Sequence, residues 1–401
     1  MTRQPDVPRF ACLDALRGYA VLMVIVTHAV DRIPTVPTPV AAIAVYGWHG
    51  VQLFFIVSAL TLMLSWRAQP AGPGRLYEFA VRRIFRIVPM YYAAALFYLV
   101  ARPPANEPPV GHLLAQVFLV HGWTPFHMNV TPESWIMVPG SWSVAVECGF
   151  YMLFPFLMIH VTGLRRAVIL LGTSLVAAAV LNAIARDAFT PLHGTVAAEQ
   201  FIYYWLPNQL PVFALGLIVF YLRPLAVSER DAVVPRPSGV LSWCVIAGAG
   251  LSFCGLALYE AYGGALPRSA ELDGGLMPPR HLLVALLLSA VVVVVARNPR
   301  GLLVNPVAVL FGKVSYGAYL LHFAVLDQAG RLLVALFPVP PEDYAAIGVF
   351  AVMSVLSAAA TLALAWIAHV AVERPMIRLG RRVGRLRLRG MEPVKVRMPE
   401  G

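Results

Sequence analysis

Arg17 and His28 stand inside one apolar stretch, LDALRGYAVLMVIVTHAV, at residues 13–30. On an α-helix, which turns 100° per residue, they lie about 20° apart on one face and roughly 16 Å apart along the axis. A histidine can act as a general base, and an arginine can bind an anion. Ionisable side chains at membrane depth usually face a pathway or a reaction site. The alternatives are an Arg17 that extends to lipid headgroups and a His28 that is a buried structural histidine.

A carboxylate that could orient this histidine lies in GSWSVAVECGFYMLFPF at residues 140–156. Ser143 and Glu147 are four residues apart and share a helical face. If this helix starts at the outer surface, Glu147 lies about one turn below it, at a depth comparable with that of His28. We therefore expect Glu147 to pair with His28, because pairing would satisfy both buried groups. Two unrelated buried polar groups are the alternative.

Three basic residues, Arg82, Arg83 and Arg86, gather in RLYEFAVRRIFRIVPMYY at residues 75–92, where an apolar segment begins. Guanidinium groups bind phosphate well through paired hydrogen bonds. The cluster therefore indicates a site for a phosphorylated cytoplasmic cofactor. Anchoring to anionic lipid headgroups is the alternative explanation.

A last polar set, Ser315, Tyr319 and His322, lies in GKVSYGAYLLHF at residues 312–323 and shares one helical face. A polar contact between helices is the expected role. The sequence contains no GxSxG, no Walker loop, no GxGxxG after a strand and no His/Cys set with metal-ligand spacing. No metal is therefore expected, and the four cysteines are expected to be ordinary buried thiols.

The elements that must position these residues are apolar helices. Of the 401 residues, 59% are hydrophobic and only 13% are charged, against about 25% charged in soluble domains. The mean hydropathy is +0.72. Solid apolar runs exclude a β-barrel and predict an all-α membrane protein. Eleven segments are apolar: 15–33, 47–66, 88–101, 111–125, 142–161, 166–185, 201–222, 238–259, 281–296, 304–327 and 344–370.

The segment at 111–125 is short and polar, and the positive-inside rule decides whether it crosses. If the N-terminus is cytoplasmic and segment 111–125 does not cross the membrane, 25 of the 31 Lys and Arg residues lie on the cytoplasmic side. If that segment crosses, only 12 do. We therefore predict ten transmembrane helices and two cytoplasmic termini. Residues 111–141 are expected to form a re-entrant or surface segment on the outer side, where irregular backbone must be buried in protein or line a wet cavity. Residues 1–380 form one membrane domain, and residues 381–401 form a basic cytoplasmic tail expected to be disordered. The placement of the net charge of +11 favours membrane lipids over nucleic acid as its partner.

Taken together, these stretches resemble the acyltransferase 3 family of integral membrane acyltransferases. The matching pieces occur in family order: LDALRGYAVLMVIVTH, GVQLFFIVSALTL, RRIFRIVP, SWSVAVECGFYMLFP, SYGAYLLHF and the closing VERP. The resemblance implies ten spans, acetyl-CoA or another short acyl-CoA as co-substrate, and a glycan or other acceptor.

The resemblance also implies roles for individual residues. His28 matches the catalytic histidine and Arg17 its arginine partner. Arg82, Arg83 and Arg86 match a basic motif linked to acyl-CoA. Trp142, Ser143 and Glu147 match a tryptophan–serine–glutamate motif. Two departures leave the acceptor preference open: Gln52 stands where an acidic residue is common, and Ala145–Cys148 replaces a more acidic stretch.

The function expected from these features is that of an inner-membrane O-acyltransferase, with acetyl as the expected group. It would act on a surface or secreted polysaccharide, presented as a glycan or lipid-linked glycan. Two alternatives stay open: an acyltransferase for a small secondary metabolite such as a macrolide, and a transporter or flippase of an anionic glycolipid.

Overall fold

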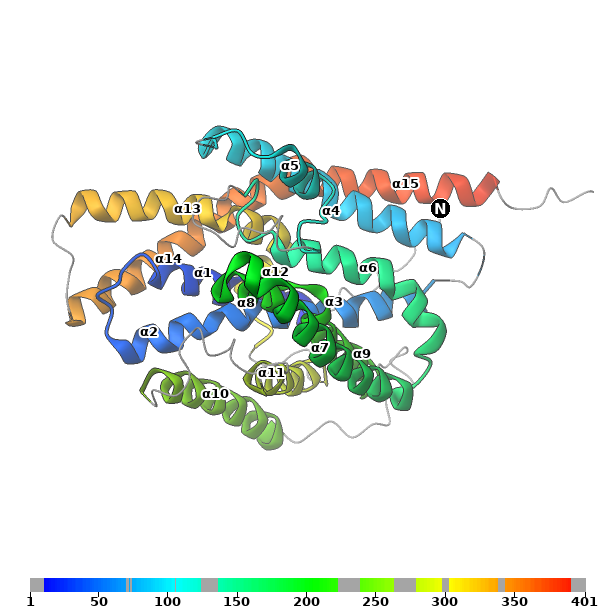
Figure 1. Ribbon diagram of the computed structural model, residues 1–401, viewed down its shortest axis with the longest axis horizontal. Helices are drawn as coiled ribbons and strands as arrows, with labels where there is room; N and C mark the ends of the chain where they lie inside the picture. The colour runs from blue at the N-terminus through cyan, green and yellow to red at the C-terminus, as the bar shows by residue number, and fades with distance from the viewer. Residues whose placement is uncertain are drawn as a thin grey trace, which may run out of the picture.

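The computed structural model describes residues 11–69, 72, 74–104, 106–123, 136–222, 239–262, 279–297, 303–337 and 343–390. Every regular element in these ranges is a helix (Figure 1). Their bounds are α1 (Ala11–Val30), α2 (Thr38–Val45), η1 (Tyr46–His49), α3 (Gly50–Arg67), α4 (Arg75–Ala101), α5 (Val110–Val117), α6 (Trp142–His160), α7 (Leu164–His193), α8 (Thr195–Tyr204), α9 (Leu206–Leu222), α10 (Gly239–Tyr262), α11 (Pro279–Arg297), α12 (Pro306–Lys313), α13 (Ser315–Leu336), α14 (Asp343–Ala368), η4 (His369–Glu373) and α15 (Arg374–Gly390).

Ten stretches of the described chain are helical, long and apolar enough to cross a membrane, as predicted. Several are composite: α2, η1 and α3 follow one another without a loop, and α14, η4 and α15 do the same. Which end of each stretch faces the cytoplasm stays a prediction. This bundle makes the chain a multi-pass membrane protein.

The predicted span 304–327 is two helices, because the chain bends at Val314 between α12 and α13. The Asn305 side chain caps α12 by accepting a hydrogen bond of 2.9 Å from the backbone N–H of Ala308. Pro306 follows at the first helical position, where the absence of an N–H does no harm. The short α12 can therefore pack beside α1 while α13 continues in its own direction.

Glycines bring α1 close to its neighbours in the middle of the bundle. A Cβ on Gly18 of α1 would overlap the carbonyl oxygen of Ala308, and one on Gly312 of α12 would overlap that of Asp14. A Cβ on Gly50 of α3 would likewise overlap the carbonyl oxygen of Ala20. Small residues permit such backbone approach between membrane helices. These contacts fix the position of α1, which carries both Arg17 and His28.

The segment between α4 and α6 does not contribute a span in the described residues. Its helix α5 has eight residues, which cover roughly 12 Å and cannot cross a bilayer. Tyr91 and Tyr92 of α4 hold its end by donating hydrogen bonds to the carbonyls of Gln116 and Val117, at 3.2 and 2.8 Å. Whether this segment is re-entrant or lies on the outer surface stays a prediction.

The C-terminal boundary predicted at residue 380 falls inside α15, which continues to Gly390. Helix α15 packs along the first half of α4, where Gly380 lies against Phe85 and Gly384 against Glu78. In Figure 1 the two helices run side by side at one end of the bundle, opposite the free ends of α13 and α14. Residues 391–401 of the predicted tail lie outside the described residues.

Candidate active site

A cavity of about 670 Å³, counting its open mouth, lies between α1, α3, α4, α6 and α13. Its described lining is Arg17, Val51, Phe54, Phe55, Ser58, Thr61, Arg83, Arg86, Ile87, Ser143, Val144, Glu147, Tyr151, Ser315, Tyr316 and Tyr319. Three guanidinium groups and one carboxylate therefore face the same space. This charge balance favours an anionic ligand.

Arg17 is held in this cavity from two sides. It donates a hydrogen bond of 2.8 Å to the Thr61 hydroxyl on α3. Asp14, one turn earlier on α1, forms an ion pair with it at 3.6 Å. Arg17 is thus fixed inside the protein, so the structure favours a cavity role over extension to lipid headgroups.

The three arginines of α4 that were predicted to bind the cofactor divide between two faces of the helix. Arg83 and Arg86 line the cavity, and the Arg83 guanidinium lies 5.6 Å from the centre of the Tyr151 ring. Arg82 instead pairs with Glu78, one turn earlier on the side of α4 that packs on α15. Two of the three predicted cofactor-binding arginines therefore meet at the cavity, and Arg82 does not.

Glu147 does not pair with His28, and that prediction is wrong. Its carboxylate accepts hydrogen bonds from Ser58 of α3, at 2.5 Å, and from Tyr151. The depth argument assumed that α6 starts level with the outer end of α1. The structure shows that it starts deeper, so Glu147 lies closer to the level of Arg17 than to that of His28 and lines the same cavity as Arg17.

The packing of Ser143 shows this offset. Ser143 donates a hydrogen bond of 2.8 Å to Tyr319, and Tyr319 precedes His322 by about one helical turn on α13. Since Glu147 lies one further turn along α6, it is roughly 10 Å from the level of His28.

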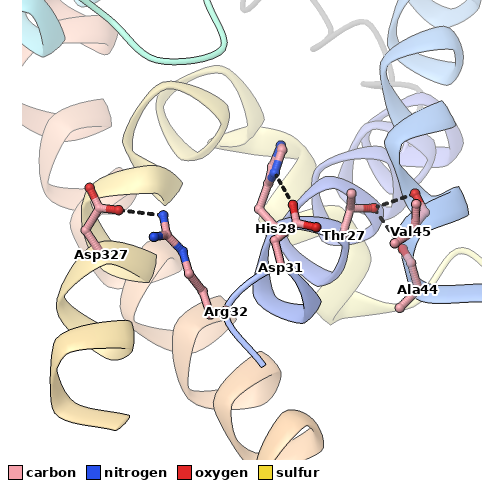
Figure 2. Close-up of polar contacts among 7 residues, drawn as sticks. All are labelled: Thr27, His28, Asp31, Arg32, Ala44, Val45 and Asp327. Carbon is pink, nitrogen blue, oxygen red and sulfur yellow. Dashed lines mark hydrogen bonds and ion pairs between the residues drawn. The ribbon is translucent and has the colours of Figure 1, made fainter. Parts of the chain in front are cut away.

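The carboxylate that contacts His28 belongs to Asp31, just after the end of the same helix, α1 (Figure 2). The Asp31 Oδ2 atom lies 3.4 Å from His28 Nδ1. Because a carboxylate only accepts, this contact assigns a proton to Nδ1 and leaves Nε2 as the basic nitrogen. Sequence reasoning missed Asp31, although its i, i+3 spacing from His28 was a usable signal.

The ring of His28 packs against α13. It stacks on His322 with ring centres 5.4 Å apart and contacts Phe323 at 4.5 Å. His322 is fully buried, and its Nδ1 lies 2.6 Å from the Tyr319 carbonyl, which assigns Nδ1 as the donor. His322 Nε2 has no hydrogen-bond partner among the described residues. Two imidazoles, each with its proton assigned to Nδ1 and an unprotonated Nε2, therefore lie together.

Tyr319 separates this histidine pair from the cavity. Its hydroxyl lines the cavity, where it accepts from Ser143 and donates to the Gly140 carbonyl at 2.9 Å. Its ring lies 5.7 Å from that of His322 on the other side. Trp142 directly precedes Ser143 on α6 and packs on Tyr204, with ring centres 4.4 Å apart. It is not among the described residues that line the cavity.

The arrangement places a cavity lined by three arginines next to a pair of neutral imidazoles. Sequence reasoning also missed the hydroxyl groups of Ser58, Thr61 and Tyr151, which hold the charged residues in place. The described residues contain no group of three or more His, Cys, Asp or Glu side chains that could hold a metal ion.

Comparisons with known proteins agree with this chemistry. The chain matches a family model described as an acyltransferase domain (Acyl_transf_3) over residues 10–370. No solved structure matches it.

Three relatives show how far the similarity extends. "Acyltransferase MdmB" of Streptomyces mycarofaciens is 27% identical over 403 residues, which cover 94% of each chain. A "Putative O-acetyltransferase" of Staphylococcus aureus (strain COL) is 26% identical over 331 residues, covering 79% of this chain and 50% of the relative. "O-acetyltransferase OatA" of Staphylococcus aureus (strain NCTC 8325 / PS 47) is 23% identical over 231 residues, covering 55% of this chain and 36% of its own. The chain thus spans about half the length of the first Staphylococcus relative. Because the family model covers most of the chain, the chain belongs to the acyltransferase 3 family.

Proposed function

We propose that this protein is an acyl-CoA-dependent O-acyltransferase of the bacterial inner membrane. It moves a short acyl group, which we propose to be acetyl, from acyl-CoA to a hydroxyl group. One observation carries the proposal: a cavity with three arginines is separated by a single tyrosine from two stacked histidines. Phosphate groups of the donor bind to Arg83 and Arg86. Arg17 lines the same cavity and shares a face of α1 with His28, so it binds the part of the donor that lies between the phosphates and His28.

His28 then serves as the general base. Its Nε2 takes the proton of the acceptor hydroxyl while the hydroxyl oxygen bonds to the thioester carbonyl carbon. The carbon–sulfur bond breaks, and the departing thiolate takes the proton back from the imidazolium. Asp31 stabilises that imidazolium through Nδ1. In a second route, His28 Nε2 bonds to the acyl carbon as the thiolate of CoA leaves, and then passes the acyl group to the acceptor hydroxyl. This route depends on the same nitrogen.

The acceptor is proposed to be a surface or secreted polysaccharide. Two relatives that match part of the chain are named O-acetyltransferases, which supports acetyl transfer to an oxygen and names no acceptor. A small secondary metabolite is the alternative acceptor, and MdmB, which matches almost the full length of both chains, is named an acyltransferase without an acceptor. Purified protein supplied with acetyl-CoA and each acceptor class separates these two possibilities.

His28→Ala tests the mechanism. In purified protein the variant should still bind acetyl-CoA, because His28 does not line the cavity. Its transfer rate should fall by at least about 10²-fold, the lower end of what a general base contributes. His160→Ala, which alters an exposed histidine of α6, is the matched control and should keep wild-type rates.

Transfer above about a tenth of the wild-type rate in His28→Ala would contradict this role. His322, the imidazole stacked on His28, would then be the next candidate. If wild-type protein consumes no acetyl-CoA with any acceptor while transporting an anionic glycolipid, the transporter alternative would replace the proposal.

A further inference from the structure

The cavity lined by three arginines, which we call the arginine cavity, has a charged end and an apolar end. On α3, the lining residues Thr61 and Ser58 hold two charged residues of the cavity by hydrogen bonds. Phe55, Phe54 and Val51 follow toward the start of the same helix and also line the cavity. Val51 lies roughly 15 Å along the helix from Thr61. The lining therefore changes from charged to apolar along α3.

Helix α6 shows the same order. The Tyr151 ring lies 5.6 Å from the Arg83 guanidinium, and its hydroxyl donates a hydrogen bond to Glu147, one turn earlier. Val144 follows about one turn further toward the start of α6 and lines the cavity as well. Both helices thus place their polar lining residues at one end of the cavity and their apolar ones at the other.

Contacts with Tyr319 bring the apolar residues of the two helices to the same level. Phe54 packs edge-on against the Tyr319 ring, with ring centres 5.9 Å apart. Ser143, which directly precedes Val144, donates its hydrogen bond of 2.8 Å to the Tyr319 hydroxyl. We call the four apolar residues at this level the apolar end: Val51, Phe54, Phe55 and Val144.

The two hydroxyl groups beside the apolar end are already partnered. Ser143 donates to Tyr319, and Tyr319 donates to the Gly140 carbonyl at 2.9 Å. Each hydroxyl proton is therefore used within the protein. A hydrocarbon group gains from burial in such a place, because it leaves water and breaks no hydrogen bond.

Phe55 forms a rigid wall at the apolar end. Its ring stacks on that of Phe213 with ring centres 4.6 Å apart, and Phe213 stacks on Phe150 at 3.9 Å. All three side chains are buried. Because protein interiors are close-packed, Phe55 has no room to move aside for a larger ligand.

The two ends of the arginine cavity match the two ends of an acyl-CoA molecule, which carries its phosphates at one end and its acyl thioester at the other. We propose, resting on the function proposed above, that the apolar end binds the acyl group of the donor and that Phe55 and Val144 restrict this group to a short chain. The thioester then lies beside Tyr319, whose ring contacts His322 next to His28.

Isothermal titration of the full-length protein in detergent with free CoA, acetyl-CoA and butyryl-CoA tests this subsite without any transfer reaction. Wild-type protein should bind acetyl-CoA at least about tenfold more tightly than butyryl-CoA, since one methylene in a closed apolar pocket makes about that difference. Phe55→Leu, which makes room, should bind the two alike. Val144→Leu, which adds one methylene to the wall, should weaken butyryl-CoA binding about tenfold further. Free CoA should bind equally to all three proteins.

Phe201→Leu on α8 is the matched control. Phe201 is also buried and packed on another ring, but it is not among the described residues that line the cavity, so the variant should keep the wild-type difference. Equal binding of acetyl-CoA and butyryl-CoA by wild-type protein would overturn the subsite, and so would a wild-type difference in Phe55→Leu. Failure of free CoA to bind wild-type protein would instead contradict the proposed donor, and the subsite with it. Each variant must elute as a single species, and Val144→Leu decides if Phe55→Leu does not fold.

Discussion

His28 contacts the carboxylate of Asp31, three residues away, while Glu147 on α6 lies among the arginines of the cavity. The position of Glu147 follows from the cost of burying a charge without a partner. Glu147 lies among three guanidinium groups and accepts two hydroxyl donors. Asp31, which is exposed just after the end of α1, contacts the His28 imidazole through Nδ1. The residues proposed to bind the donor and those proposed to act on the acceptor are therefore two sets, and Tyr319 lines the cavity of the first set and contacts His322 beside the second.

The arginines of α4 permit a direct test of donor binding at this scale. Arg83→Ala with Arg86→Ala should weaken acyl-CoA binding by about 2–3 kcal/mol, because charge-assisted hydrogen bonds to phosphate are lost. Arg82→Ala is the internal control and should bind normally, since its guanidinium pairs with Glu78 on another face. Isothermal titration with purified protein measures both. Weakened binding in Arg82→Ala, or normal binding in the double variant, would show that the cavity does not hold the phosphates.

At the scale of elements, α1 is the helix on which the site depends. It carries Arg17 toward the cavity and His28 toward α13, and its backbone nearly touches α12 and α3. The distance between the two functional groups is fixed by the helix itself, and their partners are fixed by how closely the neighbours approach. Gly18, Gly50 and Gly312 are therefore as important to the site as the charged residues.

Gly18→Ala tests that packing. The added methyl group would overlap the carbonyl oxygen of Ala308, so the two helices must separate, at a cost of about 1–3 kcal/mol. Gly172→Ala on α7 is the matched control, because a Cβ there meets nothing within 4 Å, and it should be neutral or slightly stabilising. Thermal unfolding in detergent should show a lower Tm for Gly18→Ala alone. Equal Tm values for the two variants would mean that α1 and α12 are not closely packed.

On the scale of the whole molecule, the arginine cavity, lined by α1, α3, α4, α6 and α13, and the histidine pair are two separate places in the described bundle. The arginine cavity lies toward the end where α4 packs on α15, and the histidine pair lies near the other end of α1. Such a separation suits an enzyme that takes its donor from one side of a membrane and serves an acceptor on the other. This assignment rests on the orientation predicted from the basic residues.

Cysteine labelling tests the orientation. On a background in which the four native cysteines are replaced by alanine, Glu107→Cys between α4 and α5 should react with a membrane-impermeant maleimide added to intact cells. Gly163→Cys between α6 and α7 should react only after the membrane is opened. Both positions are in loops between helices of the described chain. The reverse labelling pattern would invert the membrane orientation and place the arginine cavity on the outer side.

The sequence by itself predicted the class of the fold and several of the residues that line the arginine cavity. Apolar runs of spanning length predict helices because a bilayer leaves few other ways to satisfy the backbone. The periodicity of a helix then predicts that Arg17 and His28 share a face, and likewise Ser315, Tyr319 and His322. These are properties of single helices, so they follow from residue spacing alone.

Only the tertiary structure decided which of these helical faces contact one another and how far the helices are shifted along their axes. Residue spacing does not give the axial offset between two helices, and α6 starts deep enough to bring Glu147 to Arg17 and away from His28. The same holds for Arg82, which is one residue from Arg83 but points to another neighbour because successive helical residues differ by 100°. The offset and rotation of each helix depend on contacts such as those of Gly18 and Gly312, which form between segments almost 300 residues apart. The partner of each charged group is therefore a property of the packed bundle.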